Sequence, residues 1–358
     1  MLCVDDLSPK KICFVVEGGF GVGLGHCYRA LSIAETFADD VEKNFILTPG
    51  SFAGRTFMES KNINRFQICD SYSEIVERLI EYQPDVVVND ILNSREDYMV
   101  ALRKSGLSSV NIDDIGPGSF MANLVINSVY DGNNTARCLY GSRYVDVKSK
   151  YFLANKKKLS PKVKTILITF GGEDPANLTR RVIDIVGSHS ALRRYCYQVV
   201  LGCGYRWKKQ IVKQLAELRL TANILVDVDL AKIMGEVDMA IAANGRTTFE
   251  LAAMGVPTVV ISAHARECLN TFYREAGFFY CGNCELITDQ QILNKLLVLS
   301  SNFQKRLEMR NKMQGLELQH GLTRINRAIR SQMKVATSLQ RKNETMPRVN
   351  CEELEHLV

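Results

Sequence analysis

The stretch that leads into His26 carries the strongest chemical signature of this sequence. Four glycines alternate over residues 19–25, after an apolar run and ahead of residues that favour a helix. Glycine lets the backbone approach a ligand closely, and a helix start presents N–H groups and the positive end of its dipole to an anion. We therefore expect Gly23 and Gly25 to contact a substrate.

His26 has the side chain best suited to proton transfer in this stretch. At the start of a helix the dipole disfavours a charged imidazolium, and a neutral imidazole is what a general base requires. A histidine that only caps the helix or packs in the core is the alternative. The glycines immediately before His26 favour the catalytic role.

Acidic residues end two apolar runs of the first half of the chain. Asp90 follows the run 85–89, and Asp114 follows the run 110–113. Both should lie at the sheet edge that carries His26, where a carboxylate can orient an imidazole or bind a sugar hydroxyl. We expect Asp90 and Asp114 to assist catalysis, although aspartate also favours turns and helix caps.

A second glycine turn resembles the first and joins another apolar run to another helical segment. Gly171 and Gly172 free the backbone there, and Asp174 or Asn177 can cap the following helix. We expect all four residues to contact substrate. A plain strand–helix turn explains this piece of sequence equally well.

A third turn, at residues 243–250, has the composition of a diphosphate site. Backbone N–H groups and hydroxyls at a helix start hold phosphate oxygens, and an arginine supplies the charge. Glu250 falls on the first turn, where it could reach a ribose diol or complete a capping box. The expected ligands of the diphosphate are Asn244, Gly245, Arg246, Thr247 and Thr248.

Short apolar runs alternate with amphipathic segments, which predicts an α/β fold with parallel sheets covered by helices. The expected strands are 12–16, 44–48, 85–89, 110–113 and 124–127, then 165–170, 198–201, 223–226, 238–242 and 258–262. The expected helices are 26–38, 72–82, 94–104, 177–189, 205–218 and 247–254, followed by one or two helices within 301–333.

The two series of runs predict two Rossmann-like, doubly wound domains around a cleft. The polar, basic segment 155–162 contains a proline and is typical of a linker. We expect an N-terminal domain at 1–155 on the sugar side, a C-terminal nucleotide-binding domain at 156–335, and a polar tail at 336–358. Ligands of such sheets bind beyond the carboxyl ends of the strands.

Composition excludes several classes of protein. Of the 358 residues, 46% are hydrophobic and 23% charged, so a disordered or fibrous chain is excluded. No apolar run approaches the roughly 20 residues of a membrane span, and the first twelve residues carry acids where a signal peptide is basic and apolar. We expect a cytoplasmic protein without a transmembrane segment.

Charge and cysteine content point away from nucleic acids and metals. A net charge of +6 is mild for this length, and the single Trp207 does not make a stacking surface, so we expect no nucleic-acid partner. The eleven cysteines are irregularly spaced, and we expect them to be reduced thiols. The pair Cys281 and Cys284 lacks further ligands nearby. We expect neither a metal nor another cofactor.

The alternating glycines do not make a dinucleotide fingerprint. Their spacing differs from that motif, and no clear acidic residue closes a second strand about 20 residues further on. The sequence therefore gives little support to a nicotinamide cofactor.

Taken in order, the motifs resemble a family of sugar-nucleotide hydrolases. This family hydrolyses UDP-2,4-diacetamido-2,4,6-trideoxy-β-L-altropyranose in pseudaminic acid biosynthesis and is similar to the MurG-type glycosyltransferases. The resemblance covers residues 10–330, and no single stretch of it is specific. The matching stretches are 23–29, 111–114, 140–144, 170–175 and 245–250.

The resemblance implies a GT-B fold that binds a UDP-sugar. Uridine and diphosphate would lie on the second domain, at the loops that contain Gly171, Gly172 and residues 245–250. His26 would activate water for attack at the anomeric carbon, giving UDP and the free sugar without a metal. Arg29 would support the loop or the diphosphate.

Two alternatives remain open at the level of sequence. Glu17 and Gly18 stand where better-known members carry Arg-x-Asp, and residues 262–268 replace a glutamine-containing loop. A MurG-like transferase, in which His26 deprotonates an acceptor hydroxyl, fits the same motifs. A module that binds a nucleotide sugar without consuming it fits as well. The sequence does not indicate the oligomeric state.

Overall fold

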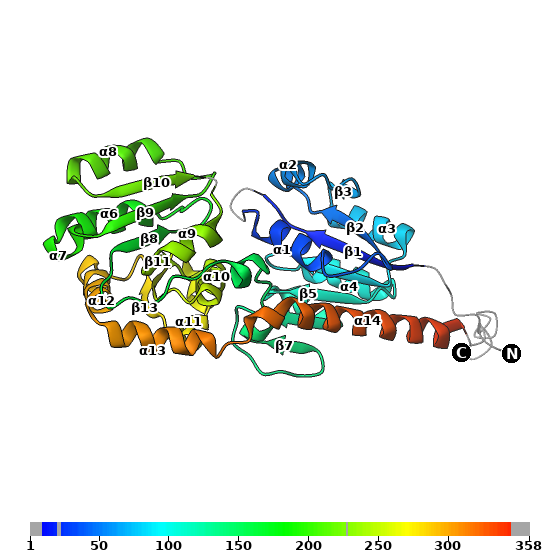
Figure 1. Cartoon of the computed structure of the whole chain (residues 1–358). Helices are drawn as coiled ribbons and strands as arrows, with labels where there is room; N and C mark the ends of the chain where they lie inside the picture. The colour runs from blue at the N-terminus through cyan, green and yellow to red at the C-terminus, as the bar shows by residue number, and fades with distance from the viewer. Residues whose placement is uncertain (1–8, 20–22, 227, 345–358) are drawn as a thin grey trace, which may run out of the picture. The chain divides into compact units, whose positions relative to one another are not determined.

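The computed structural model of the chain describes residues 9–19, 23–226 and 228–344, with side chains of the last helix described as far as Met333. It divides into two compact units, each built around one sheet (Figure 1). The first unit comprises Met1–Val125 and Asn326–Val358, and the second comprises Ile126–Ile325. The units are described separately below.

The first sheet has seven strands in the order β3-β2-β1-β4-β5-β6-β7. Its innermost part is fully buried, since Ile12–Val16 have no exposed surface. Pairing is parallel from β3 through β5. A strand that helices cover on both faces has a continuous run of apolar residues in its sequence, as β1 does. The strands are β1 (Lys10–Val16), β2 (Val41–Leu47), β3 (Phe66–Ile68), β4 (Val86–Asp90), β5 (Ser109–Ile112), β6 (Leu124–Asn127) and β7 (Cys138–Tyr140).

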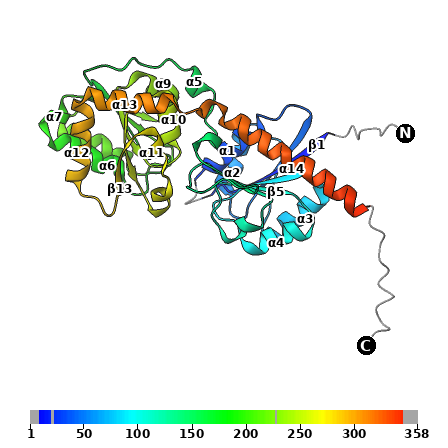
Figure 2. The same ribbon diagram turned by 90° about the horizontal axis from the view of Figure 1, so that it is seen from below.

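Helices connect the parallel strands of the first unit, because parallel neighbours need a crossover connection. They are α1 (Gly25–Ala34), α2 (Phe52–Ser60), α3 (Tyr72–Tyr82), α4 (Glu96–Lys104) and the 3₁₀ turn η1 (Pro117–Met121). The last helix, α14 (Gly321–Glu344), lies along this unit in both views (Figure 2). Asn326 of α14 donates to the carbonyl of Thr36 at 3.1 Å, and Arg330 pairs with Asp40 at 3.3 Å.

The second sheet has six parallel strands in the order β10-β9-β8-β11-β12-β13. The strands are β8 (Thr165–Thr169), β9 (Cys196–Leu201), β10 (Ala222–Val226), β11 (Met239–Ala243), β12 (Thr258–Ser262) and β13 (Phe279–Asn283). The helices are α5 (Lys150–Leu153), α6 (Leu178–Ser188), α7 (Ser190–Arg193), α8 (Lys208–Leu218), α9 (Leu230–Glu236), α10 (Thr247–Met254), α11 (Phe272–Ala276), α12 (Asp289–Ser301) and α13 (Phe303–Gln314). The 3₁₀ turns are η2 (Ser142–Tyr144), η3 (Ala265–Leu269) and η4 (Leu318–His320).

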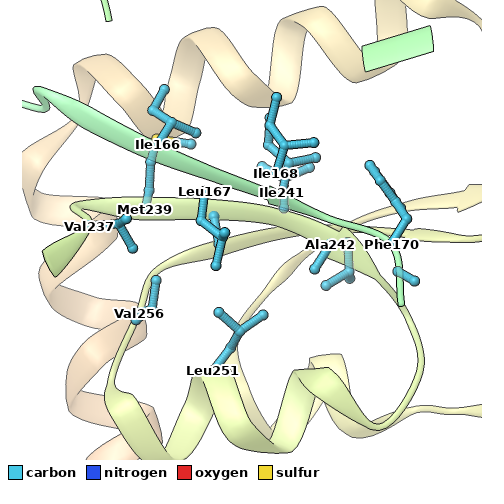
Figure 3. Close-up of a cluster of buried hydrophobic side chains, with 14 of the residues drawn as sticks. Ile166, Leu167, Ile168, Phe170, Val237, Met239, Ile241, Ala242, Leu251 and Val256 are labelled. Carbon is cyan, nitrogen blue, oxygen red and sulfur yellow. The ribbon is translucent and has the colours of Figure 1, made fainter. Parts of the chain in front are cut away.

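Both faces of the second sheet are apolar, which is why helices cover both. Ile166 and Ile168 of β8 point to one face, and Leu167 points to the other (Figure 3). On that second face Leu251 of α10 packs below the sheet, and it has no exposed surface. Burial of such side chains contributes roughly 1.5–3 kcal/mol each.

Each sheet reverses its strand order at its first strand. In the first sheet the reversal falls between β1 and β4, and in the second between β8 and β11. Ligands of doubly wound sheets bind beyond the carboxyl ends of the strands at this switch point. The loops after β1, β4, β8 and β11 are therefore the ones that position a site.

The predicted GT-B-like α/β fold, with two Rossmann-like doubly wound domains, is confirmed. The predicted segments 72–82, 124–127, 247–254 and 258–262 coincide with α3, β6, α10 and β12. The sequence analysis did not predict α2, β3, β7 or β13.

The contacts group residues 126–155 with the second unit and residues from 326 onward with the first unit. The division at 155 and 335 stays a sequence prediction. Within the expected tail, α14 continues to Glu344, and residues 345–358 lie outside the described part. No helix among the described residues is long and apolar enough to cross a membrane.

Candidate functional site

Four titratable or charged side chains meet at the switch point of the first sheet. His26 and Arg29 lie on the first turns of α1, Asp90 ends β4, and Asp113 follows β5. His26 Nδ1 lies 2.6 Å from Asp90 Oδ1, and Arg29 Nε donates to Asp90 Oδ2 at 2.8 Å. Arg29 also donates to Asp113. The parallel strand order brings these separate stretches of sequence together.

The carboxylate of Asp90 is held in its ionised form. Asp90 has no exposed surface and Arg29 is 4% exposed. Burial raises the pKa of Asp90, but the charge and hydrogen bonds of Arg29, with a further contribution from His26, outweigh burial and hold the pKa well below its usual value. Asp90 is therefore a fixed negative charge at the His26 ring.

The environment of His26 leaves one ring nitrogen for chemistry. Nδ1 faces both Asp90 and a guanidinium nitrogen of Arg29, the latter at 3.2 Å. The other nitrogen, Nε2, can act as a base when Nδ1–H donates to Asp90. Arg29 at +1 and the two aspartates at −1 each give the surroundings of the ring a net charge of −1.

The glycine loop ahead of α1 is described only at its two ends. Gly23 has a φ of +75° and donates its N–H to the carbonyl of Gly19 at 3.0 Å. A side chain at Gly23 or Gly25 would meet nothing within 4 Å, so their surroundings are open. Residues 20–22 lie outside the described part.

Asp114 belongs to a different network from the one expected. Its carboxylate accepts hydrogen bonds from the Ser94 N–H at 3.0 Å, the Ser94 hydroxyl at 2.5 Å and the Asn111 amide at 2.6 Å. Gly116 N–H donates to it as well, at 2.8 Å. These bonds tie the loops after β4 and β5 together. The carboxylate that reaches the His26 cluster is that of Asp113, the preceding residue.

In the second unit, the turn after β8 is organised by Asp174. The carboxylate accepts from the N–H groups of Leu178 and Thr179, both at 2.8 Å, and so satisfies the first turn of α6. Asn177 accepts from the Tyr205 hydroxyl at 2.6 Å instead. Asp174 therefore fills the place that an anion would take at this helix start.

The glycines of this turn serve two different needs. Gly171 has a φ of +81°, which favours glycine, and a side chain there would meet nothing within 4 Å. A side chain at Gly172 would also meet nothing within 4 Å, whereas a Cβ added at Gly202 would lie 2.2 Å from the Gly172 carbonyl oxygen. Both Gly171 and Gly172 border open space, and of the two only Gly171 also needs a glycine conformation.

We expect Asp174→Ala to lower the free energy of unfolding by about 1–2 kcal/mol, because two N–H groups of α6 lose their acceptor. The measurement is urea unfolding followed by circular dichroism. Asp184→Ala, on the same helix beyond its first turn, is the control. Equal stability of Asp174→Ala and wild type would mean that the cap contributes nothing.

The predicted ligand residues in the turn after β11 fall into two groups. Asn244 has no exposed surface, and its amide donates to the carbonyls of Glu267 and Asn270 at 2.8 and 2.9 Å. The Thr248 hydroxyl donates to the Gly245 carbonyl at 2.7 Å. Asn244 and Thr248 thus hold the turn in shape, and their side chains are already engaged.

The remaining residues of this turn face the start of α10, which has no side-chain cap. Arg246 pairs with Asp146 and keeps 34% of its side chain exposed. Glu250 lies on the first turn and is partly buried. It makes no capping box at the start of α10. Burial raises the pKa of Glu250, and the neighbouring Tyr151 and Arg246 oppose that rise.

The start of α10 has no side-chain cap, which leaves its first N–H groups without a side-chain acceptor. Gly245, Arg246 and Thr247 precede or begin the helix, where backbone N–H groups and the dipole favour an anion. Among the described residues, no group of three or more His, Cys, Asp or Glu side chains could hold a metal ion.

Sequence reasoning missed four residues of these two clusters: Asp113, Asp146, Tyr151 and Glu267. Asp113 was visible as the neighbour of Asp114. The other three lacked any local signal, because they approach the α10 turn from segments far along the chain. Glu267 accepts from the Ala263 N–H at 2.7 Å and lies over Gly245, where an added Cβ would be 2.8 Å from its Oε1.

Most of the second unit is similar to a known domain family. Residues 165–325 match the glycosyltransferase family 28 C-terminal domain. The matched range contains the loops after β8 and β11, and it excludes the whole His26 cluster.

Two curated relatives match over most of this chain. An uncharacterized protein of Methanocaldococcus jannaschii is 27% identical over 288 residues, which cover 74% of this chain and 58% of that protein. The chain therefore spans little more than half of that relative. The spore coat polysaccharide biosynthesis protein SpsG of Bacillus subtilis is 20% identical over 305 residues, covering 82% and 90%.

Solved structures show the same fold. MurG of Acinetobacter baumannii superposes with a TM-score of 0.67 at 17% identity, covering 90% of this chain and all of that one. Anabaena Alr3699/HepE, solved in complex with UDP, gives a TM-score of 0.62 at 15% identity, covering 91% and 100%. This chain shares the GT-B type of fold with MurG.

Proposed function

We propose that this protein hydrolyses a UDP-linked amino sugar to UDP and the free sugar. The observation that carries the proposal is the cluster at the end of the first sheet, in which Asp90 holds Nδ1 of His26 at 2.6 Å. A carboxylate in this position orients an imidazole and stabilises the imidazolium that forms when the ring takes a proton. An oriented base is what activation of water requires.

The reaction is a single displacement at the anomeric carbon. Nε2 of His26 takes a proton from water while the water oxygen forms a bond to the anomeric carbon. The bond from that carbon to the diphosphate oxygen breaks, and its electron pair leaves with UDP. Attack opposite the leaving group inverts the configuration, as in inverting glycoside hydrolysis.

The second unit would bind the nucleotide. The start of α10, with Gly245, Arg246 and Thr247, holds the diphosphate and stabilises the charge that develops on it. Glu250 accepts hydrogen bonds from the ribose hydroxyls. Gly171 borders the sugar or phosphate. We assign supporting roles to Asp114, Asp174, Asn177, Asn244 and Thr248, because the protein's own backbone and side chains already engage them.

The wider process is the synthesis of a surface polysaccharide or of a nonulosonic acid of the pseudaminic type. The support is the similarity to SpsG, whose printed name places that protein in spore coat polysaccharide biosynthesis. We also retain the prediction of a cytoplasmic protein that acts without a nucleic-acid partner.

Transfer of the same sugar to an acceptor hydroxyl is the second candidate function. The match of residues 165–325 to a glycosyltransferase domain favours it. In this reaction His26 would deprotonate the acceptor instead of water, with the same leaving group. The two candidates differ only in the nucleophile.

The deciding experiment incubates the purified chain with UDP- and CMP-linked amino sugars and no acceptor, and follows the products by mass spectrometry. A hydrolase releases UDP and free sugar in equal amounts. Tight UDP binding without release would favour the transferase, and addition of candidate acceptors would then restore turnover. A chain that bound no UDP would contradict both.

Glu250→Gln is expected to weaken UDP binding about 10–100-fold, because a neutral amide replaces a charged acceptor. The turnover number should fall less than the affinity. Isothermal titration calorimetry gives the dissociation constant, and Glu308→Gln on the exposed face of α13 is the control. Unchanged UDP affinity would show that Glu250 does not touch the nucleotide.

A further inference from the structure

The outer edge of β10 presents backbone groups that no described strand pairs with. β10 ends the second sheet, and β9 is its neighbour on the inner side. The Tyr197 N–H of β9 donates to the Thr221 carbonyl at 2.8 Å, so Thr221 and every second residue after it face β9. The residues whose N–H and C=O groups face away from the sheet are therefore Ala222, Ile224 and Val226.

The other edges of the two sheets carry features that oppose further pairing. β3 and β7 have only three residues each, and the pairing of β13 with β12 contains a register shift. Proteins protect exposed edges in these ways, and also with charged residues or proline. β10 has five residues in continuous register with β9, and its sequence contains no proline and no charged residue. This edge therefore has none of the usual protection.

An apolar groove of about 600 Å³ lies beside this edge, lined by residues of α8 and β10 (Figure 1). Val212 and Leu215 of α8 line it together with Ile224, and Arg219 is the one charged residue of the lining. Val212 is 51% exposed, and every residue of β10 is at least partly exposed. Apolar side chains beside a strand edge that lacks a partner favour contact with another chain over water.

The edge is complementary to a second copy of itself. In an antiparallel pair with a two-fold axis at Ile224, this residue faces its own copy and Ala222 faces Val226. All three direct their backbone groups outward, so each donor meets an acceptor. The two ends also differ in charge, because Arg219 precedes β10 and Asp229 follows it. Antiparallel pairing places the basic end of one copy beside the acidic end of the other.

We propose that β10 pairs antiparallel with β10 of a second copy of this chain, so that two sheets join into one across a two-fold axis. Apolar side chains of each copy fill the groove beside the other. The interface is isologous and closes on itself, because each copy uses its only unprotected edge. The inference is independent of the proposed function, since β10 and α8 contribute no residue to the His26 cluster or to the turn before α10.

Sedimentation velocity of the full chain between about 1 and 100 µM tests the proposal, and we expect a wild-type dimer that dissociates on dilution. Ala222→Pro removes an outward N–H at the first residue of an edge strand, a position where a folded monomer accepts proline. By symmetry the dimer loses two ladder hydrogen bonds. We therefore expect its dissociation constant to rise at least about tenfold.

Val212→Lys is a second variant, which changes an exposed side chain and leaves β10 intact. It brings a charge into the groove of each copy, and we expect it to weaken the dimer at least as much as Ala222→Pro does. The matched control is Val298→Lys on α12, where the valine is 45% exposed and does not line the groove. This control should sediment as wild type does.

A cysteine cross-link tests the register of the pairing. Facing residues of an antiparallel hydrogen-bonded pair have Cα atoms about 5.5 Å apart, which lies within the range of a disulfide. Ile224→Cys should therefore give a covalent dimer on mild oxidation, detected by non-reducing electrophoresis. Asn223→Cys is more exposed but does not face its own copy, so it should cross-link no more than wild type.

Three results would overturn the inference. Wild-type protein that remains a monomer over the whole concentration range would exclude the pairing. A dimer that neither Ala222→Pro nor Val212→Lys weakens would use another surface. Cross-linking of Asn223→Cys in preference to Ile224→Cys would exclude the two-fold axis at Ile224.

Discussion

Replacement of His26 by asparagine is expected to lower the turnover number for the UDP-linked sugar by about 10²–10⁴-fold, the usual contribution of a general base. Asparagine keeps a polar group beside Asp90 and Arg29 but cannot take a proton from water. The affinity for UDP should stay within a few-fold of wild type, because no part of the second unit changes. Release of UDP under saturating substrate measures the first effect, and calorimetry measures the second.

The control for this variant is His320→Asn, which changes an exposed histidine of the second unit. Full turnover in His320→Asn together with loss in His26→Asn assigns the effect to the base. Unchanged turnover in His26→Asn would exclude His26 as the base.

Replacement of Arg29 by methionine is expected to lower the free energy of unfolding by about 3–5 kcal/mol, since two buried carboxylates then lack their cation. Asp90 and Asp113 are 0% and 5% exposed, so water cannot take the place of the guanidinium. Methionine keeps much of the length and apolar bulk of the arginine stem. The measurement is urea unfolding at pH 7.

The pH dependence of this effect follows from the pKa of Asp90. In wild type the folded pKa lies below the unfolded value, so Asp90 stabilises the fold above the unfolded pKa, and this contribution is lost as the pH falls through the folded one. Without Arg29, burial dominates and the folded pKa lies above the unfolded value. The variant then gains stability as the pH falls. The difference between the free energies of unfolding of the variant and of wild type therefore decreases between about pH 8 and pH 4.

Two further variants isolate the charge effect from packing. Arg55→Met removes an exposed arginine whose pair with Glu59 is 60% and 54% exposed, and it should cost at most about 1 kcal/mol. The double variant Arg29→Met, Asp113→Asn removes one of the two uncompensated charges and should be more stable than Arg29→Met alone. A double variant that is less stable would show that packing, not charge, sets the cost.

The sequence by itself determined the α/β class and the ends of its most regular elements. Buried parallel strands show as apolar runs and amphipathic helices as a 3.6-residue period, so β6, β12, α3 and α10 begin and end where expected. The short strands β3 and β7, of three residues each and partly exposed, give no such signal. The glycine turns after β1, β8 and β11 could be predicted because the backbone conformation of a turn favours glycine at particular positions, which the local sequence shows.

The neighbouring residues Asp113 and Asp114 show what tertiary structure decided. Sequence reasoning named Asp90 and Asp114, and not Asp113, as the carboxylates that assist catalysis. In the structure Asp113 adopts a φ of +49°, and the chain turns so that the two carboxylates join different networks. Asp113 binds Arg29, and Asp114 binds Ser94 and Asn111. A sequence pattern does not specify which of two adjacent aspartates the turn directs to a given partner.

The same distinction applies to the turn before α10. Residues 244–248 and Glu250 were all plausible ligands from their types, and the fold engages Asn244 and Thr248 in holding the turn itself. Asp146, Tyr151 and Glu267 reach this turn from other segments. A local sequence pattern reflects the conformational requirements of the backbone within a few residues. The partners of a side chain are set by which distant strand ends and loops the sheet order brings side by side, and only the folded chain specifies that.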